Sequence, residues 1–421
     1  MSTKLTIFYN TTAQAVGRFF TAGITYFITL FLVREYGAVG FGEFTKILTY
    51  VSYFYIFADF GANAYIVKKL SEDEETSLKH LSNLMGLRLI FALFLIFLSL
   101  AFLVVLPQGS GQGFTFVTRI GVIIASLTMI TQAMITTFSA WFQKNLRYDK
   151  LSLTLIIGNL FTLIVAYFIT LSSLPVYYVF VAYVFGQAIS VFLCYLLAEK
   201  KFGLGFDFTY WKRIIAFSWP LGLTLIFNLV YFKVDSFILT LTRSTQEVGI
   251  YGLAYKFFEM AIIFPSFFMN SLYPVFLEKL KERPGNFSEL TKNIGVFLIG
   301  TSLVLALTIF FIAPFLINFT AGDKQADFVG GISALRILSL SLPAFFLSSF
   351  FMWVLITTQK QILLVPFYGF SMILNIFLNI LLIPRYGYLA AASTTLITEV
   401  CVTLLLAIPV WRIIKKNKTS G

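Results

Sequence analysis

Residues 11–71 read TTAQAVGRFF TAGITYFITL FLVREYGAVG FGEFTKILTY VSYFYIFADF GANAYIVKKL S. This stretch consists of two long apolar runs that meet at Arg34–Gly40. Each run is long enough to cross a membrane as a helix, which takes about 20 apolar residues. Charged residues nevertheless lie inside the runs, with Arg18 in the first and Lys46 and Asp59 in the second. These charges are the first candidates for functional residues.

The rest of the chain has the same character. Hydrophobic residues make up 58% of the 421 positions and charged residues only 12%, and the mean hydropathy is +0.87. Because a soluble domain carries roughly a quarter charged residues, we predict an all-α polytopic membrane protein. Twelve runs are predicted to span the membrane, near residues 11–33, 40–66, 82–106, 114–141, 151–172, 175–197, 213–241, 248–276, 293–317, 332–357, 361–383 and 387–411.

The net charge of +12 is distributed unevenly between the two sides of the membrane. If the N-terminus is cytoplasmic, most Lys and Arg side chains fall in the cytoplasmic loops and the two tails, which predicts that both termini are cytoplasmic. The basic excess is therefore interpreted as a topology signal and a contact for membrane lipids, and no nucleic-acid partner is expected. The opposite loops and span ends hold mainly Arg34, Arg119, Arg243, Lys324 and Arg385.

Metal, cofactor and enzyme chemistry are not indicated. Cys194 and Cys401 both lie within spans and have no metal-ligand spacing, so neither a metal site nor a disulfide framework is predicted. A membrane polymerase or glycosyltransferase needs catalytic acids or bases on a substantial loop, and no external loop is much longer than a dozen residues. His80, the sole histidine, falls in a cytoplasmic loop. We predict no catalytic residues and no cofactor.

Part of the opening stretch recurs 210 positions later. In each half an aromatic residue and a glycine open the second run, a lysine follows four residues after the glycine, and Lys-Leu-x-Glu closes it. Six spans per half would make parallel repeats, an arrangement found in transporters. The matching positions are 41, 42, 46, 69, 70 and 72 in one half, and 251, 252, 256, 279, 280 and 282 in the other.

The repeat predicts two lobes, an N-lobe over residues 1–205 with six spans and a C-lobe over residues 206–421 with the other six. The interface between two such lobes is a natural cavity. The basic and aromatic segment 198–212 joins them, and we expect its Tyr210 and Trp211 to anchor it at the membrane interface.

Charges inside the spans need a partner or a watery cavity, because a charge at the bilayer centre costs about 2.5 kcal/mol or more. Arg88 and Arg336 lie near enough to span ends for their long side chains to reach the headgroups, and Glu43 and Glu399 are interpreted as structural. The other in-span charges are Arg18, Lys46, Lys233, Lys256, Asp59, Asp235 and Glu259.

Arg18 lies deeper, ~7–13 residues into its span and so roughly 10–20 Å from the start. Two roles remain open for it, an interhelical ion pair with Asp59 or an anion site.

Lys256 and Glu259 share a helix face and could neutralise each other. Lys233 and Asp235 are two residues apart, so at least one must face another element. Asp59, Asp235 and Glu259 are candidates for ion coupling or charge pairing.

The first two spans of each half hold two of these cations, which makes four in total. A neutral or cationic cargo would not need so many. Arg has forked donors and Lys a point charge, and both suit an anionic cargo such as a diphosphate headgroup. We therefore predict that the substrate-binding residues are Arg18, Lys46, Lys233 and Lys256.

Several short motifs occur in a characteristic order along the chain. They are Val39–Phe44, Ala58–Gly61, Pro220 with Asp235, Val248–Lys256, Ile383–Tyr388 and Ala390–Ala392. Together with the span count, this set resembles the polysaccharide-transporter branch of the multidrug/oligosaccharidyl-lipid/polysaccharide exporter superfamily. That branch includes the flippases for O-antigen and capsule repeat units, which serve lipopolysaccharide and polysaccharide biosynthesis.

The resemblance implies two six-helix lobes that form a V around a central cavity and rock between inward-open and outward-open states. It implies a cargo of undecaprenyl-diphosphate-linked oligosaccharide, moved from the cytoplasmic to the outer leaflet of the bacterial inner membrane. A polysaccharide polymerase and a chain-length regulator are candidate partners.

Two alternatives on the same fold remain open. The related lipid II flippases use cavity arginines and usually have fourteen spans, so one candidate arginine and twelve spans favour a repeat-unit flippase. A cation-coupled multidrug or toxin antiporter would show more cavity carboxylates than bases, which the excess of in-span cations argues against.

Overall fold

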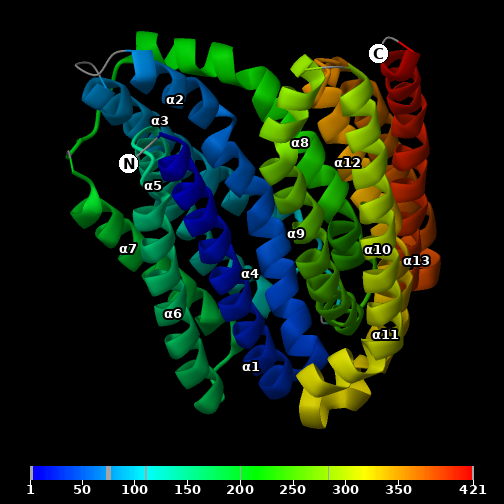
Figure 1. The fold of residues 1–421 in the computed structure, drawn as a ribbon. Coiled ribbons are helices and arrows are strands. Elements are labelled where there is room, and N and C mark those ends of the chain that lie inside the picture. Colours follow the sequence, from blue (N-terminus) through cyan, green and yellow to red (C-terminus); the bar gives the residue numbers. More distant parts are fainter. Residues whose placement is uncertain (1–2, 73–76, 110, 200, 283, 420–421) are drawn as a thin grey trace. The chain divides into compact units, whose positions relative to one another are not determined.

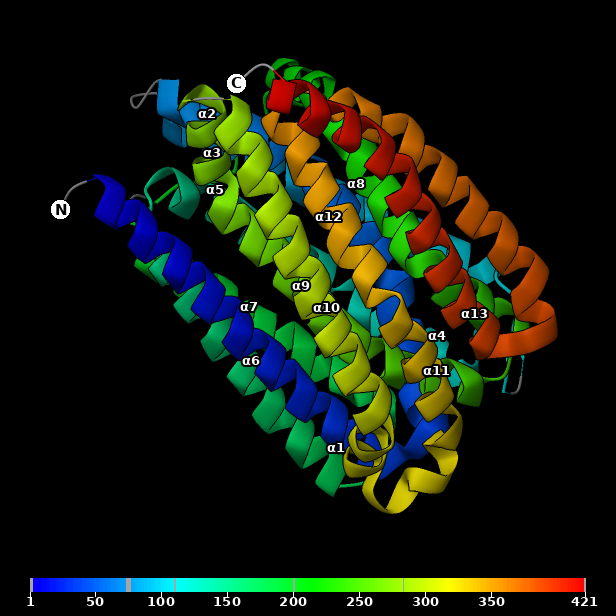
Figure 2. The ribbon, with the colours of Figure 1, turned by 45° about the vertical axis from the view of Figure 1, so that its right-hand side comes forward.

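Helices account for almost all of the residues that the structure, a computed structural model, describes: 3–72, 77–109, 111–199, 201–282 and 284–419. Within these ranges there is no strand, only a single bridge between Gln108 and Gly113. Figures 1 and 2 show the helices from two directions. The helices are α1 (Thr3–Asp59), α2 (Ala62–Glu72), α3 (Ser77–Val105), α4 (Phe116–Ser126), α5 (Thr128–Lys144), α6 (Tyr148–Leu171), η1 (Val176–Tyr178), α7 (Val179–Leu197), α8 (Phe208–Thr242), α9 (Thr245–Glu282), α10 (Pro284–Ala321), η2 (Gly322–Phe328), α11 (Val329–Leu340), α12 (Leu342–Thr357), η3 (Gln361–Leu363) and α13 (Leu364–Thr419).

Two of these helices are hairpins. In α1 the backbone at Gly37 has φ 61° and ψ −164°, and in α13 the backbone at Gly387 has φ 62° and ψ −143°. Both pairs of angles are open to glycine, which lacks a Cβ. The chain reverses direction at each of these two glycines, as the dark blue helix α1 and the orange-to-red helix α13 in Figures 1 and 2 show. Each of these two helices therefore supplies two spans.

The predicted number of spans is confirmed. Nine segments of the described residues are long and apolar enough to cross a membrane. Two of them contain the hairpins of α1 and α13. A third, Phe287–Thr357, contains both α10 and the α11–α12 pair, so the nine segments hold twelve spans. The protein is an all-α, multi-pass membrane protein.

The outer surfaces of the spans are apolar, as a membrane requires. Phe97 on α3 is 69% exposed and Phe311 on α10 is 71% exposed, which would be costly in water. A helix that is apolar all round is suited to lipid or to a protein core. The many phenylalanines of the sequence thus include residues on the lipid side as well as residues packed between helices.

The chain forms two compact units, Met1–Val230 and Tyr231–Gly421, which meet within α8. The first half of α8 packs within unit 1, because Trp211 donates from Nε1 to the carbonyl oxygen of Asn83 at 2.8 Å. Trp211 is only 6% exposed, so its expected role as an interface anchor is wrong. The lobe boundary expected between residues 205 and 206 stays a prediction.

The order of elements is the same in both halves of the chain. Each half has a hairpin, a single helix, a bent helix and a second hairpin. The bent helix is α4–α5 with its break at Leu127 in one half, and α11–α12 with its break at Ser341 in the other. This common order supports the predicted duplication.

The two hairpin turns of each half are also in contact. In unit 1, Tyr36 of the first turn donates to the carbonyl oxygen of Leu174 in the last turn at 2.6 Å. In unit 2, Arg243 of the first turn donates from NH1 to the carbonyl oxygen of Pro384 in the last turn at 3.3 Å. The same pair of turns is thus joined in each half, by different residue types.

Replacing Gly387 with Ala is expected to destabilise the protein by about 1–2 kcal/mol, because its positive φ is unfavourable for a residue with a Cβ. The new Cβ would also clash with Glu247 Oε2 in its present position, so the Arg243–Glu247 ion pair would have to shift. Gly369 is the matched control, since it lies in the same α13 with nothing within 4 Å of its added Cβ. Gly369→Ala should be neutral or stabilising. Thermal unfolding of the purified variants measures both effects, and equal unfolding temperatures would contradict this account of the turn.

Candidate functional site

A cluster of two lysines and one glutamate lies between α8 and α9 in unit 2. Lys233 of α8 contacts Glu259 Oε1 from Nζ at 2.6 Å, and Lys256 of α9 contacts Glu259 Oε2 at 3.0 Å. We call these three residues the lysine–glutamate cluster. The turn at residues 243–244 makes α8 and α9 antiparallel neighbours, which brings the two lysines to one carboxylate.

The lysine–glutamate cluster carries one more positive charge than negative charge. Its side chains are 25% (Lys233), 30% (Lys256) and 29% (Glu259) exposed, so they are accessible despite lying within spans. Lys233 Nζ also lies 5.1 Å from the centre of the Tyr255 ring, close enough for a cation–π contact. A pair of ammonium groups that share one carboxylate can accept a second anion.

Asp235, also on α8, makes its hydrogen bonds outside this cluster, as the two-residue spacing from Lys233 predicted for at least one of the pair, although it lies within electrostatic range of Lys233. Asp235 is 3% exposed. Its Oδ1 accepts from the backbone N–H of Ser236 at 2.6 Å, and its Oδ2 accepts from the Tyr251 hydroxyl. A carboxyl group held in this way is suited to proton or cation exchange, and that role for Asp235 stays a prediction.

Glu399 on α13 is a second buried acid of unit 2, and sequence reasoning had interpreted it as structural. It is 2% exposed, and its two oxygens accept from Tyr231 at 2.7 Å and from Ser348 at 3.3 Å. A buried carboxyl group with tyrosine and serine donors has the same chemistry as Asp235. The sequence signal was present, because Glu399 is one of the five in-span acids, but hydropathy alone does not show which partners face it.

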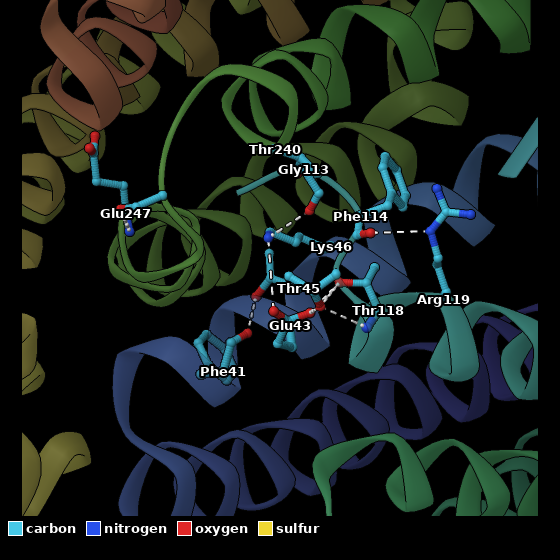
Figure 3. Close-up of polar contacts among 12 residues, drawn as sticks. Phe41, Glu43, Thr45, Lys46, Gly113, Phe114, Thr118, Arg119, Thr240 and Glu247 are labelled. Atoms are coloured by element: carbon cyan, nitrogen blue, oxygen red, sulfur yellow. Dashed lines mark hydrogen bonds and ion pairs between the residues drawn. The ribbon is translucent and has the colours of Figure 1, made fainter. Parts of the chain in front are cut away.

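In unit 1, Lys46 is enclosed near the turn of α1. Its side chain is fully buried, with Nζ donating to the carbonyl oxygen of Gly113 at 2.8 Å and 4.0 Å from Glu43 Oε1. Glu43 in turn accepts from Thr115 at 2.8 Å and from Thr118 (Figure 3). Lys46 therefore ties α1 to the α3–α4 loop in this conformation. Its role as a substrate-binding residue stays a prediction.

Arg88 does not reach the headgroups, so the prediction that it snorkels is wrong. Its side chain is 3% exposed and contacts Asp59 Oδ1 from NH2 at 2.7 Å, Asn63 Oδ1 at 2.9 Å and Thr137 Oγ1 at 3.2 Å. These partners come from α1, α2 and α5, which surround the start of α3. Asp59 therefore forms an ion pair inside unit 1, one of the two roles expected for it.

This ion pair lies at a break in the second span. The helix α1 ends at Asp59, and Phe60 and Gly61 have positive φ values of 41° and 73° before α2 begins. A positive φ is uncommon for a phenylalanine and indicates a position that its surroundings hold in place. Arg88 bridges the break, because it contacts Asp59 on one side and Asn63 on the other.

Arg18 lies on the first arm of α1, with an exposed side chain within electrostatic range of Tyr148. Its neighbours Phe19 and Phe20 are exposed by 79% and 54%. Of the predicted substrate-binding residues, the structure brings Lys233 and Lys256 together through Glu259. Arg18 and Lys46 each lie elsewhere in unit 1, in different surroundings.

The fold is that of a membrane transporter, and comparison with known proteins identifies the family. Residues 7–279 match the family of polysaccharide biosynthesis proteins, and residues 220–381 match the MatE family. The chain therefore belongs to the polysaccharide biosynthesis protein family, within the multidrug/oligosaccharidyl-lipid/polysaccharide exporter superfamily. The predicted relationship is confirmed.

Individual proteins are also similar to this chain. The chain is 25% identical over 424 residues to MJ1375, an uncharacterized membrane protein of Methanocaldococcus jannaschii, with 94% of each chain covered. The structure of the lipid II flippase MurJ in an inward closed conformation is similar, with a TM-score of 0.77, 16% identity and coverage of 96% of this chain and 90% of that one. An inward-facing multidrug resistance MATE family transporter gives a TM-score of 0.73, 12% identity and coverage of 95% and 96%.

Proposed function

We propose that this transporter is a flippase for undecaprenyl-diphosphate-linked oligosaccharide repeat units, including those of O-antigen and lipopolysaccharide. The observation that supports this proposal most strongly is the lysine–glutamate cluster, an accessible group with a surplus positive charge inside membrane-spanning helices. A charge in a membrane span is energetically costly unless it is paired or binds a charged ligand, and Glu259 neutralises only one of the two lysines. A diphosphate supplies the remaining negative charge.

Membership of the polysaccharide biosynthesis family supports the same proposal. In the proposed cycle the repeat unit enters from the cytoplasmic leaflet and leaves to the outer leaflet by alternating access. The membrane is the bacterial inner membrane, and both termini are cytoplasmic. The proposed partners are membrane lipids, a polysaccharide polymerase and a chain-length regulator.

Two other cargoes have specific support. The likeness to MurJ favours lipid II, another undecaprenyl-diphosphate lipid. The buried carboxyl groups of Asp235 and Glu399 favour a cation-coupled antiporter, since each accepts from one tyrosine hydroxyl and is suited to exchange a cation or a proton. In a flippase, the same acids would couple ion movement to transport.

The proposal is tested by the class of ligand that the purified protein binds. Undecaprenyl diphosphate should bind at least about tenfold more tightly than undecaprenol, because only the former offers a charge to the lysines. Rising salt should weaken this difference. Tight binding of the lipophilic cation tetraphenylphosphonium, without preference for the diphosphate, would favour the antiporter.

Arg18 belongs to the proposal as a second anion-binding position. Replacing Arg18 with Ala is expected to abolish export of surface polysaccharide in a strain that depends on this protein, while the variant remains in the membrane. Arg18→Lys keeps the charge and should retain part of the activity, since Lys lacks only the forked geometry. Normal export by Arg18→Ala would remove Arg18 from the proposed site.

A further inference from the structure

An apolar groove of about 920 Å³ runs between α9 and α10 in unit 2. Its walls are four residues of α9, among them Phe257, Met260 and Phe264, and six residues of α10, among them Gly300 and Val304. The volume falls within the range of small-molecule sites, roughly 300–1,000 Å³. The groove is open at the outer surface, where Val304 is 66% exposed and Phe264 is 42% exposed.

The groove begins beside the lysine–glutamate cluster. Phe257 directly follows Lys256 in the sequence, and Met260 directly follows Glu259. Lys256 and Met260 are four residues apart on α9, so they lie on the same face of the helix, one turn from each other. The apolar surface then continues along α9 to Phe264, about 12 Å from Lys256 at 1.5 Å per residue. Lys256 is 30% exposed and Met260 is 38% exposed, so the positive charge of Lys256 adjoins the edge of the apolar groove on one face of α9.

Aromatic rings and a glycine shape this groove. Phe264 stacks on the buried Phe346 of α12 with ring centres 5.8 Å apart, which makes a rigid rear wall. Toward the other end, the rings of Phe268 and Phe297 lie 5.3 Å apart and join α9 to α10. At Gly300 an added Cβ would meet nothing within 4 Å, so the absence of a side chain there leaves the middle of the groove open.

We propose that this groove holds the polyisoprenoid chain of the lipid-linked substrate while the lysine–glutamate cluster holds its diphosphate. The inference rests on the proposed function and adds a second, apolar subsite to it. A polyprenyl diphosphate joins a doubly charged head directly to a long branched apolar chain, and the surface of α9 presents the matching groups in that order. Phospholipid acyl chains also reach the membrane face of the protein, and they are the competing occupant.

The test compares two ligands on the full-length protein in phosphatidylcholine nanodiscs: undecaprenyl diphosphate, and dimethylallyl diphosphate, which has the same head on a single isoprene unit. Gly300→Phe is expected to weaken binding of undecaprenyl diphosphate by about tenfold, because the ring displaces buried CH₂ groups of the chain. Binding of dimethylallyl diphosphate should not change. Gly369→Phe is the matched control, a helical glycine of α13 with open space around it, and should leave both affinities unchanged.

The outcomes separate the inference from the proposed function. If Lys256→Gln weakens both ligands but Gly300→Phe weakens neither, the chain lies elsewhere and the inference is wrong, whereas the proposed function stands. If the unmodified protein binds neither ligand, both fail.

A second measurement avoids any variant that fails to fold. Undecaprenyl diphosphate with a photoreactive group in its chain should label residues 257–264 or 297–309 of the unmodified protein. Excess undecaprenyl diphosphate should prevent the labelling, and excess phosphatidylglycerol should not. Equal protection by both lipids would show that phospholipid occupies the groove and would overturn the inference.

Discussion

Replacing Lys256 with Glu is expected to abolish transport of the lipid-linked diphosphate, with at least about a hundredfold loss, whereas Lys256→Gln should reduce it only partly. Lys256 and Glu259 are 3.0 Å apart in the structure. Charge reversal would place two carboxylates beside a single ammonium and change the cluster from one surplus positive charge to one surplus negative charge. At a separation of about 4 Å and an effective dielectric constant of about 20, one charge pair is worth about 4 kcal/mol, so repulsion of a diphosphate should dominate.

Transport of a fluorescent lipid-linked diphosphate across proteoliposomes measures this effect. Lys324→Glu is a suitable control, because Lys324 is an exposed lysine of η2 and the change in net charge is identical. Similar, mild losses for Lys256→Glu and Lys256→Gln would instead indicate that Lys256 only neutralises Glu259. That result would leave the anion-binding role without its main support.

Replacing Asp59 with Leu should cause the largest loss of stability, about 3 kcal/mol or more. The change leaves the guanidinium of Arg88, which is 3% exposed, with only the neutral acceptors Asn63 and Thr137. An uncompensated buried charge is strongly destabilising, and breaking such a pair typically costs about 3–5 kcal/mol. Thermal unfolding of the purified protein, together with the amount in the membrane, measures the effect.

The converse substitution should cost less. Arg88→Met leaves Asp59 charged, but Asp59 is 34% exposed and can be solvated. The double variant, Asp59→Leu with Arg88→Met, should be more stable than Asp59→Leu alone, because no unpaired charge remains. If the double variant is as unstable as the sum of the two single variants, charge pairing is not what Arg88 and Asp59 contribute.

The membrane-spanning architecture was predictable because hydropathy acts on every residue of a span. The apolar run at 11–33 corresponds to the first arm of α1, and the run at 40–66 covers its second arm and the start of α2. The glycine between the two runs, Gly37, forms the turn. Span number and fold class follow from such averages. The buried position of Trp211 does not, because an interfacial tryptophan and one packed against Asn83 have the same local sequence.

Individual charges were harder to place. Depth along a span suggested that Arg88 could reach water, but the direction of its side chain is decided by Asp59 and Asn63 on neighbouring helices. The repeat gave Lys46 and Lys256 equivalent positions, yet Lys46 is enclosed by the α3–α4 loop and Lys256 is 30% exposed. Spacing within one helix predicted contacts between charged residues better, as the contact between Lys256 and Glu259 shows. Residues three apart on a helix are neighbours on its surface whatever the rest of the fold is.

The central claim is that this protein moves a polyprenyl-diphosphate-linked sugar across a bilayer, and it is tested most directly by reconstitution. The purified protein is placed in proteoliposomes with an undecaprenyl-diphosphate-linked oligosaccharide, and the fraction of its sugar that an external lectin or glycosidase can reach is followed over time. We expect the accessible fraction to rise from the outer-leaflet share toward completion, and to stay at that share with Lys256→Glu. Equal accessibility in liposomes with and without the unmodified protein, under an imposed proton or sodium gradient of either direction, would contradict the account.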